Sequence, residues 1–548
     1  MRSFNVLVTD EVDPDGVDLL RAQPGFHVDE RPTTPWRELL DVIGDYDAIV
    51  GRSATQVPAE LLRHARRLQV IGRAGVGTDN IDIAEATALG IAVINAPAGN
   101  TVSVAELFFG TLISLVRNLP RAYSSMRDGR WDRSKLLGTE LRRRTLGIIG
   151  LGRIGSEVSV RAHAFDMPII AYDPYVTGER FERLQVTRAA SLDDLLHQSD
   201  VVTIHTPLNT ETRGMIRARE LARLRDGAII ANLARGGIID EADLVAELAR
   251  DRLRGVILDV FAKEPLAADH PLRTSPRVVL TPHLGASTAE GQRNVSVDVC
   301  ASLRDALLSG ELSSALNVAG GERVQWNELR DARVLAERSA AMARALLADR
   351  GARAVDQLTL RLGRQLIHAE HLLLSSAAIG VIEGVTEGAR LNIVNARSQA
   401  ESRGIALAAA PAVGSDQPYL LQVTVRSNGD EMTVAAVATP GASPRITRIG
   451  AFTVDVTPRR TMLVLANADV PGVIGRVGTL LGDAGVNIAE YHQSRTSQGG
   501  NALAAITVDG TVDATLRERL LAIPDIRSAT ILTFTEQKLD QVSGGKGL

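Results

Sequence analysis

Cysteine is almost absent from this 548-residue sequence, in which Cys300 stands alone. A single cysteine excludes an internal disulfide and a zinc site built on several thiolates, and it fits a reducing cytoplasm. Aromatic residues make up only 3% of the chain, so its cores must be packed with aliphatic side chains. An excess of one charge is also missing, because 61 Lys and Arg oppose 65 Asp and Glu, and the net charge of −4 argues against a nucleic-acid scaffold.

Long hydrophobic runs are missing as well. The longest strongly apolar run, Leu372–Ile382, has 11 residues and is too short to span a membrane. Residues Met1–Asp10 lack the charged start, apolar run and cleavage site of a signal peptide. We therefore expect a cytoplasmic protein with no membrane or nucleic-acid partner. At about 150 residues per domain, the length predicts three to four domains.

Short β-branched runs alternate with helical patterns as far as about Thr281. Because these runs lack polar alternation, they are typical of parallel strands that are buried on both faces. The alternation of strand and helix predicts an α/β architecture with doubly wound parallel sheets. The expected strands are Asn5–Thr9, Ala48–Val50, Gln69–Gly72, Ala92–Asn95, Thr145–Gly150, Ile169–Asp173, Val201–Thr206, Ala228–Asn232, Gly255–Val260 and Val278–Thr281.

The character of the chain changes after a long helix expected at Gln292–Leu308, which Gly310 ends. From about 317 to 460 we expect a separate α+β domain, with a helix at Trp326–Arg350 and a strand at Gln357–Arg361. Two more strands, Tyr419–Arg426 and Glu431–Thr439, flank an Asn-Gly turn. Residues 461–534 follow the order βαββαβ, which predicts a ferredoxin-like unit, and the polar tail after Lys538 is expected to fray.

A glycine motif, Gly150-Leu151-Gly152-Arg153-Ile154-Gly155, follows one expected strand and opens a helix. The glycines permit a tight turn, close approach of a pyrophosphate and close helix–strand packing, as in a Rossmann domain. The helix N-terminus supplies amide donors for the phosphates. Asp173 lies 18 residues after Gly155, at the end of the next strand, where a carboxylate binds ribose hydroxyls and repels a 2′-phosphate. The motif therefore predicts NAD rather than NADP, and the alternative is an ordinary glycine turn with a solvated Asp173.

Three further residues follow strands of the same sheet: Arg235, Glu264 and His283. Ligands bind beyond the carboxyl ends of parallel strands, so these side chains are expected near the NAD motif. Arginine holds carboxylates with paired donors, histidine takes up a hydroxyl proton, and a neighbouring glutamate stabilises the imidazolium. Each has a plain structural alternative, namely a strand cap, a surface ion pair and a satisfied loop histidine. Together they predict oxidation of a hydroxyl beside a carboxylate.

With these residues the chain resembles the D-isomer-specific 2-hydroxyacid dehydrogenase family, strongly over about residues 4–316 and more loosely beyond. The family-like stretches are Gly72–Asp82, Asn95–Asn100, the glycine motif, Asn232–Asp240, Asp259–Pro265 and Pro282–Thr288. The resemblance implies catalytic roles for Arg235, Glu264 and His283, and no metal. It implies cofactor contacts at Gly150, Gly152, Arg153, Ile154, Gly155, Asp173, Thr206, Leu233, Ala234, Arg235, Asp259, His283, Gly285 and Ala286. It implies substrate contacts at Arg52, Ser53, Arg73, Ala74, Gly75, Val76, Asn100 and, from a neighbouring subunit, Arg133.

The resemblance also implies the domain plan. A flavodoxin-like substrate domain is expected at 1–98 and 287–316, around a Rossmann domain at 99–286 that binds NAD. An intervening domain resembling an allosteric substrate-binding domain is expected at 317–458, and an ACT-type domain at 459–534. Helices near Thr101 and Ser287 would act as hinges for closure over the substrate.

The ACT resemblance rests on Asp469–Gly475 and Ala484–Ile488. It implies that Asp469 and Asn487 bind L-serine as an effector, although Asn467 stands where some relatives have an aromatic residue. The alternative is a dimerisation module without an effector. Arg445, Arg448, Arg459 and Arg460 could bind an anion or form a solvated basic face.

For the whole chain, the resemblance implies NAD-dependent oxidation of 3-phospho-D-glycerate to 3-phosphooxypyruvate, the first step of L-serine biosynthesis, in a homodimer or homotetramer. Arg52 and Arg73 suit the phosphate. A side activity that reduces 2-oxoglutarate to 2-hydroxyglutarate stays open. The alternatives are a dehydrogenase of another D-2-hydroxy acid, an NAD-sensing corepressor on the same fold and a purely regulatory serine-binding protein.

Overall fold

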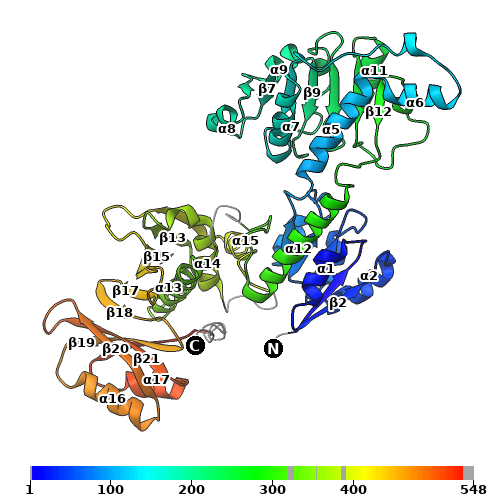
Figure 1. The fold of residues 1–548 in the computed structure, drawn as a ribbon. Coiled ribbons are helices and arrows are strands. Elements are labelled where there is room, and N and C mark those ends of the chain that lie inside the picture. The colour runs from blue at the N-terminus through cyan, green and yellow to red at the C-terminus, as the bar shows by residue number, and fades with distance from the viewer. Residues whose placement is uncertain (1–2, 319–325, 353, 384–389, 535–548) are drawn as a thin grey trace, which may run out of the picture.

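The computed structural model describes residues 3–318, 326–352, 354–383 and 390–534. Four β-sheets follow one another along the chain, and each carries its own helices (Figure 1). The residues predicted to form a frayed tail, after Lys538, lie outside the described part of the chain.

The first sheet has the order β2-β1-β3-β4-β5, and all its strands are parallel. This is the flavodoxin-like order that the sequence predicts. Its strands are β1 (Phe4–Val8), β2 (Phe26–Glu30), β3 (Ala48–Gly51), β4 (Val70–Arg73) and β5 (Ala92–Asn95). Its helices are α1 (Pro14–Arg21), α2 (Trp36–Val42), α3 (Ala59–His64), α4 (Ile83–Ala88) and, from later in the chain, α12 (Ala289–Ser309).

The second sheet has seven parallel strands in the order β12-β11-β10-β9-β6-β7-β8. The strand order reverses beside β6, which is the switch point where doubly wound sheets bind dinucleotides. The strands are β6 (Leu146–Ile149), β7 (Ile169–Tyr172), β8 (Thr187–Arg188), β9 (Val201–Ile204), β10 (Ile229–Asn232), β11 (Gly255–Leu258) and β12 (Val278–Leu280). The helices are α5 (Thr101–Val116), α6 (Leu119–Arg127), α7 (Arg153–Ala164), α8 (Gly178–Arg183), α9 (Leu192–Gln198), α10 (Ala218–Leu221) and α11 (Glu241–Ala249).

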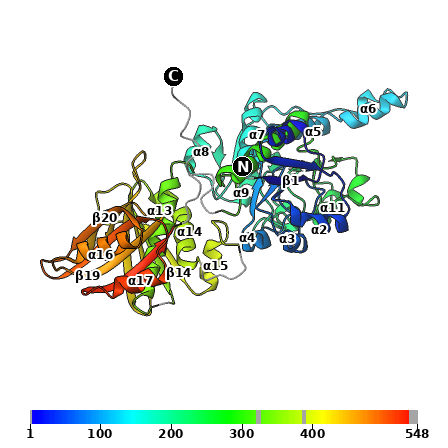
Figure 2. The ribbon, with the colours of Figure 1, turned by 90° about the horizontal axis from the view of Figure 1, so that it is seen from below.

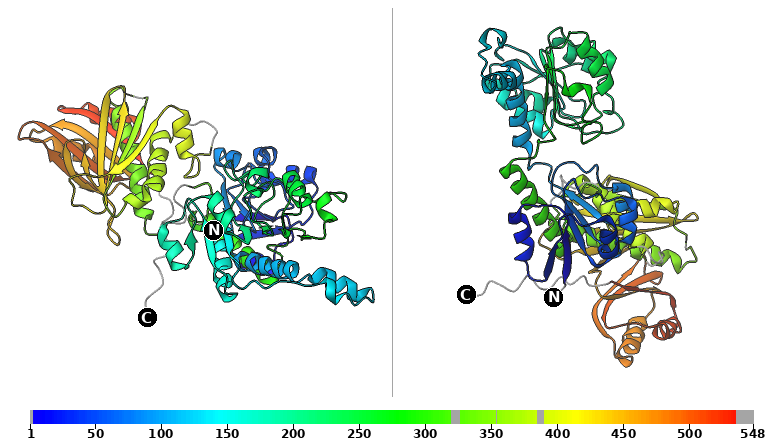
Figure 3. Two further views of the ribbon diagram at one scale, coloured as in Figure 1. Left: turned by 90° about the horizontal axis from the view of Figure 1, so that it is seen from above. Right: turned by 90° about the vertical axis from the view of Figure 1, so that its right-hand side faces the viewer.

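The first and second sheets, each with its helices, form two lobes (Figure 1, Figure 3). The chain crosses between the lobes twice, at the start of α5 and at the start of α12. The crossings meet at Ser103 and Thr288, whose hydroxyl oxygens are 2.7 Å apart. Thr288 also caps α12 by accepting from Gly291 N at 2.9 Å, and Gly310 ends the helix at a φ of +69°. α12 then packs on α1, where Ser296 Oγ donates to the carbonyl of Asp13 at 2.8 Å.

The third sheet has six strands in the order β14-β13-β15-β16-β17-β18 and is covered by two helices that cross closely. At the crossing, a Cβ on Gly380 would lie 2.0 Å from the carbonyl oxygen of Glu337, so only glycine fits there. The strands are β13 (Gln357–Leu362), β14 (Ala406–Pro411), β15 (Leu420–Ser427), β16 (Asp430–Val437), β17 (Arg445–Ile449) and β18 (Phe452–Val456). The helices are α13 (Arg330–Ala348), α14 (Glu370–Ile382) and α15 (Ala396–Ser402).

The third unit is joined to the first sheet by polar contacts. Arg390 Nη1 donates to the carbonyl of Leu68 at 2.7 Å, and Asn392 Nδ2 donates to that of Gly90 at 2.7 Å. Beneath these bonds the buried apolar side chains run as one continuous cluster from β1 and α12 to α13 and β15. The first and third units therefore share a core.

The last sheet has the order β20-β21-β19-β22 and lies beside β18 (Figure 1). Its elements are β19 (Thr461–Ala468), α16 (Val473–Asp483), β20 (Asn487–Arg495), β21 (Asn501–Asp509), α17 (Ala514–Leu521) and β22 (Ile526–Thr533). The predicted ferredoxin-like order βαββαβ is confirmed. Asp349, just after α13, accepts from Arg517 Nη2 at 3.2 Å and so ties this unit to the third.

Most predicted strands lie within one or two residues of those observed, but five observed strands were not predicted: β2, β8, β14, β17 and β18. β8 has only two residues. β2 is an edge strand that ends in two acidic residues, Asp29 and Glu30, and β14 is an alanine-rich edge strand in a stretch that we expected only to be rich in Gly and Ala. β17 and β18 are short. Within the described residues, no single helix is long and apolar enough to cross a membrane, whereas the bent pair of α5 and α6 meets that test by length and composition alone.

Candidate active site

The glycine motif forms the turn between β6 and α7. Gly150 has a φ of +92°, and a Cβ on Gly155 would lie 2.1 Å from the carbonyl oxygen of Gly150. Gly152 has open space where its Cβ would be, and as N-cap of α7 it offers no side chain to the helix amides. A pyrophosphate can therefore approach the backbone and the uncapped N-terminus of α7, which is the fit that a dinucleotide requires.

Asp173 holds this turn in place from the end of β7. One of its carboxylate oxygens accepts from Leu151 N at 2.9 Å, and the other accepts from Tyr175 N at 2.9 Å. Each carboxylate oxygen retains a second lone pair, so hydroxyls of a ribose can still bind here. These features fit NAD.

His283 and Glu264 form a hydrogen-bonded pair at the carboxyl ends of β11 and β12, with 2.7 Å between His283 Nδ1 and Glu264 Oε2. Nε2 of the imidazole is left to face a substrate. His283 has a φ of +56°, a left-handed conformation that costs free energy and persists only where its surroundings impose it. The pair is half-exposed, as a group that meets a substrate must be.

Asp259 supplies those surroundings. Its carboxylate is fully buried and accepts from Leu284 N at 2.7 Å and from Gly285 N at 2.9 Å, while its carbonyl accepts from His283 N at 2.9 Å. Burial raises the pKa of the Asp259 carboxyl, and its hydrogen bonds oppose that shift. Its observed contacts are therefore with the histidine loop, and its contact with the cofactor stays a prediction.

Arg235 lies between the two lobes. Its Nε donates to Asp79 of the first lobe at 3.0 Å, and Nη1 donates to the carbonyl of Ala234 at 2.7 Å. A Cβ on Gly77 would lie 2.1 Å from Nη2, so the guanidinium rests against the loop Ala74–Gly77. The loop and the arginine thus offer donors to the same space, which suits a carboxylate.

Arg73 and Arg52 bring further positive charge to this space. Burial, together with the positive charges of the neighbouring Arg235 and Arg52, lowers the pKa of Arg73 to about 10. At neutral pH its guanidinium is still charged, and its buried Nε has no hydrogen-bond partner. An anion between these arginines would relieve their mutual repulsion.

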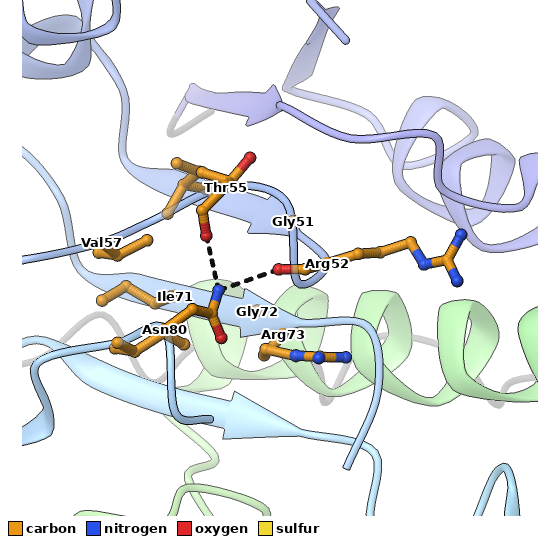
Figure 4. Close-up of a pocket in the computed structure, with 10 residues that line it drawn as sticks. Gly51, Arg52, Thr55, Val57, Ile71, Gly72, Arg73 and Asn80 are labelled. Atoms are coloured by element: carbon orange, nitrogen blue, oxygen red, sulfur yellow. Dashed lines mark hydrogen bonds between the residues drawn. The ribbon is translucent and has the colours of Figure 1, made fainter. Parts of the chain in front are cut away.

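Figure 4 shows the small cavity beside the two arginines, which is lined by the ends of β3 and β4. In it Arg52 extends toward one side, Arg73 lies below, and Asn80 bonds the backbone of the Arg52 loop. Ser53 is exposed on the same loop. The predicted phosphate contacts Arg52 and Arg73 therefore lie at one rim, next to the glycine-rich loop.

The other predicted residues lie as follows. Asn100 and Thr206 are in the region between the lobes, and each has a buried side-chain oxygen with no hydrogen-bond partner. Leu233, Ala234 and Gly285 are buried at strand ends of the second sheet, and Ile154 and Ala286 are partly exposed. Residues 119–137, which begin with α6, form an arm, and Arg133 lies on an exposed short helix, Arg133–Lys135, near the end of this arm.

The two predicted effector residues are hydrogen-bonded within the last unit. Asp469 accepts from Arg495 Nη1 at 2.9 Å and from Gly499 N at 3.0 Å, which hold the pKa of its carboxyl below the usual range. Asn487 Nδ2 donates to Asp509 at 2.9 Å. Asn467 is buried, with an unpartnered Oδ1.

Sequence reasoning assigned no role to several residues that shape the site. Asp79 and Asn80 contact the two arginine sites, and Asn95 Nδ2 donates to the carbonyl of Val76 at 2.6 Å. His205, after β9, has a pKa lowered to about 3 by burial, so it is neutral at pH 7. Asn95 and His205 could have been found from the sequence, because each stands at the carboxyl end of a buried apolar run. The described residues contain no group of three or more His, Cys, Asp or Glu side chains that could hold a metal ion.

A dinucleotide-type turn beside a histidine–glutamate pair and an arginine defines an NAD-dependent oxidoreductase that acts on a hydroxyl next to a carboxylate. Residues 109–285 match the family described as D-isomer specific 2-hydroxyacid dehydrogenase, NAD binding domain, and residues 461–525 match the ACT domain. The chain belongs to the D-isomer-specific 2-hydroxyacid dehydrogenase family, and NAD is its cofactor.

Similar proteins extend beyond the nucleotide-binding part. D-3-phosphoglycerate dehydrogenase of Synechocystis is 37% identical over 96% of this chain and 95% of its own, and that of Archaeoglobus fulgidus is 36% identical over 96% and 99%. Among solved structures, a glyoxylate reductase from Paecilomyes thermophila is 32% identical over 58% of this chain and 99% of its own, with a TM-score of 0.54.

Proposed function

We propose that this chain oxidises 3-phospho-D-glycerate to 3-phosphooxypyruvate with NAD, the first step of L-serine biosynthesis. The observation that supports the proposal is that Arg52 and Arg73 lie beside the cavity at the ends of β3 and β4, whereas Arg235 and the His283–Glu264 pair follow the neighbouring strands β10, β11 and β12 of the second sheet. These two groups would form opposite rims of the proposed substrate cleft. A substrate with a carboxylate, a hydroxyl and a phosphate matches that distribution of charge. The dehydrogenases of Synechocystis and Archaeoglobus fulgidus, similar over nearly their whole length, carry the same name.

In the proposed reaction, Arg235 and the amides of Ala74–Val76 hold the substrate carboxylate and the adjacent oxygen. His283 Nε2 takes the proton of the C2 hydroxyl, and Glu264 stabilises the imidazolium through Nδ1. NAD bound at the Gly150–Gly155 turn would supply the acceptor for the hydride that leaves C2. Arg235 steadies the oxygen as the C=O bond forms, because its positive charge favours the developing carbonyl dipole.

The remaining site roles follow the same proposal. The pyrophosphate and adenosine end of NAD is bound by Gly150, Gly152, Arg153, Ile154, Gly155 and Asp173. Its nicotinamide end is lined by Thr206, Leu233, Ala234, Asp259, Gly285 and Ala286. The substrate is bound by Arg52, Ser53, Arg73 and Asn100. The substrate domain comprises 1–98 and 287–316, the NAD domain 99–286, the intervening domain 317–458 and the ACT domain 459–534, with closure at the two crossings.

We also propose a homo-oligomer, built first as a dimer. The arm that α6 begins carries large apolar side chains in solvent, including Tyr123, Met126 and Trp131, which are 64%, 56% and 80% exposed, and it projects from the molecule (Figure 2). Such a surface is typical of a protein interface. Arg133, at the end of the arm, would then enter the site of the neighbouring subunit.

L-Serine is the proposed effector of the ACT domain, with Asp469 and Asn487 as its contacts. Serine would have to compete with Arg495 and Asp509 for these side chains. Because exposed ion pairs are weak, the competition with Arg495 for Asp469 is not prohibitive. A cytoplasmic location is supported by the free, buried Cys300, which needs no oxidising compartment.

The test is NADH formation by the purified chain from 3-phospho-D-glycerate, D-glycerate, D-lactate and 2-hydroxyglutarate, with and without serine. We expect the phosphorylated acid to have the highest kcat/KM and serine to lower the rate. Brisk turnover of an unphosphorylated acid without turnover of 3-phospho-D-glycerate would overturn the proposal in favour of another D-2-hydroxy acid. Reduction of 2-oxoglutarate, measured in parallel, tests the side activity.

A further inference from the structure

One turn of the first lobe, Thr78–Ile81, contacts both rims of the proposed substrate cleft. It directly follows the glycine-rich loop and is closed by a hydrogen bond of 3.0 Å from Ile81 N to the carbonyl of Thr78. Its two central side chains have different partners. Asp79 bonds the side chain of Arg235, and Asn80 bonds the backbone of the Arg52 loop.

Asp79 fixes the direction of the Arg235 guanidinium from across the cleft. It accepts from Nε at 3.0 Å, while Nη1 donates to the carbonyl of Ala234, so two edges of the planar group are held. The third nitrogen, Nη2, then lies against Gly77, at the end of the loop Ala74–Gly77 that is proposed to bind the substrate carboxylate and is called the carboxylate loop below. Asp79 also offsets the repulsion that Arg235 exerts on Arg73, since its negative charge acts to raise the pKa that Arg235 lowers.

Asn80 fixes the loop that carries Arg52. Its Nδ2 donates to the carbonyl of Arg52 at 3.0 Å and to that of Thr55 at 2.6 Å, as the dashed lines in Figure 4 mark. Asp10, at the end of β1, holds the other side of this loop by accepting from the backbone N–H of Arg52 and from Thr55 Oγ1. Asn80 thus connects the Arg52 loop to the turn that follows the carboxylate loop.

We propose that Asp79 and Asn80 are positioning residues, Asp79 for Arg235 at the reacting end and Asn80 for Arg52 at the phosphate end. Because the two are adjacent in one turn, they fix the spacing between the carboxylate and phosphate subsites. This inference rests on the proposed function. It predicts that loss of either side chain impairs one end of the substrate selectively.

The test compares the reduction of 3-phosphooxypyruvate with that of hydroxypyruvate, which lacks the phosphate, in Asp79→Asn and Asn80→Ala variants. Asp79→Asn should lower kcat/KM about tenfold for both compounds, because a misplaced guanidinium affects the end that they share. Asn80→Ala should lower kcat/KM about tenfold for 3-phosphooxypyruvate and less than about twofold for hydroxypyruvate. Glu85→Gln is the matched control, since Glu85 is a nearby carboxylate that pairs with Arg63 at 2.8 Å and lies outside the site.

A purely structural role would give a different pattern. Equal losses for both compounds in Asn80→Ala, or a fall in NADH affinity parallel to the loss of rate, would overturn the inference. In an Arg235→Lys background, Asp79→Asn should have little further effect, and an undiminished tenfold effect would overturn the role of Asp79. If the wild-type chain does not reduce 3-phosphooxypyruvate but reduces hydroxypyruvate briskly, the proposed function is overturned. The effect of Asp79→Asn can then still be measured with hydroxypyruvate.

Discussion

His283 is held in a strained backbone conformation, with its Nδ1 bonded to Glu264 and its loop bonded to the buried carboxylate of Asp259. These contacts leave only Nε2 for chemistry. The orientation is imposed before a substrate arrives, which is the preorganisation that proton transfer requires. In the proposed reaction the imidazole meets the substrate, so we expect its loss to affect turnover more than the binding of the adenosine and pyrophosphate of NAD.

Replacing His283 with alanine should therefore lower kcat by about 10²- to 10⁴-fold, the usual contribution of a general base, and leave NADH affinity nearly unchanged. Stopped-flow turnover and NADH fluorescence titration measure the two quantities. His64→Ala is the control, because His64 is exposed on α3 and bonds only to the carbonyl of Glu60 among its recorded partners. A large loss of NADH affinity in His283→Ala would contradict the assigned role.

Residues at the ends of buried strands could be predicted from sequence, whereas residues that act through a partner could not. Arg235, Glu264 and His283 follow apolar runs, so their common edge is implied by the parallel order. Asp79 meets Arg235 from 156 positions away, and nothing local in the sequence marks that contact. The same holds for Asn80, whose partner is a backbone carbonyl rather than a recognisable side chain.

At the scale of elements, the turn from β6 to α7 depends on the closeness of Gly155 to Gly150. A methyl group on Gly155 would meet the Gly150 carbonyl oxygen at 2.1 Å, far inside van der Waals contact. The turn would have to open, and the N-terminus of α7 would move away from the pyrophosphate.

Gly155→Ala should therefore weaken NADH binding by about tenfold or more and lower the melting temperature. Isothermal titration calorimetry and thermal unfolding measure these effects. Gly178→Ala is the matched control, because Gly178 starts α8 of the same domain and has open space around its Cβ position. Equal NADH affinity in the two variants would show that the close approach is dispensable.

Prediction of elements succeeded where burial dictates composition. The predicted bounds of β5 (Ala92–Asn95) agree with those observed, because apolar residues bounded by turn residues leave little choice. β2 and β14 are edge strands, and their residues are polar or small because one side of each strand meets solvent. Their pairing with β1 and β13 is a tertiary effect that no local pattern records.

At the scale of the whole molecule, the arm that α6 begins is the most conspicuous unpaired surface among the described residues. Leu137, near its end, is 89% exposed. If two such arms pack on the neighbouring subunits, the interface buries most of this apolar area. Removing its apolar character should then separate the subunits without unfolding them.

The double variant Tyr123→Lys/Met126→Lys should lose this interface. If the wild type is a dimer, the variant should be a monomer, and if the wild type is a tetramer, the variant should be a dimer. Light scattering after size exclusion measures these masses. Its kcat/KM for 3-phospho-D-glycerate should fall, because Arg133 would be withdrawn from the neighbouring site. Val413→Lys is the control, since Val413 is 96% exposed far along the chain from this arm. A monomeric wild type, or an unchanged mass in the double variant, would contradict the proposed dimer.

The double crossing at Ser103 and Thr288 has a consequence for the order in which the protein is made. The first lobe needs α12, which packs on α1 and contacts β4 and β5, yet α12 emerges from the ribosome only after the entire second lobe has been synthesised. Domains usually fold as units during synthesis. The second lobe can therefore complete its fold while β1 to β5 still await α12, so the N-terminal lobe, although translated first, is completed only after the second.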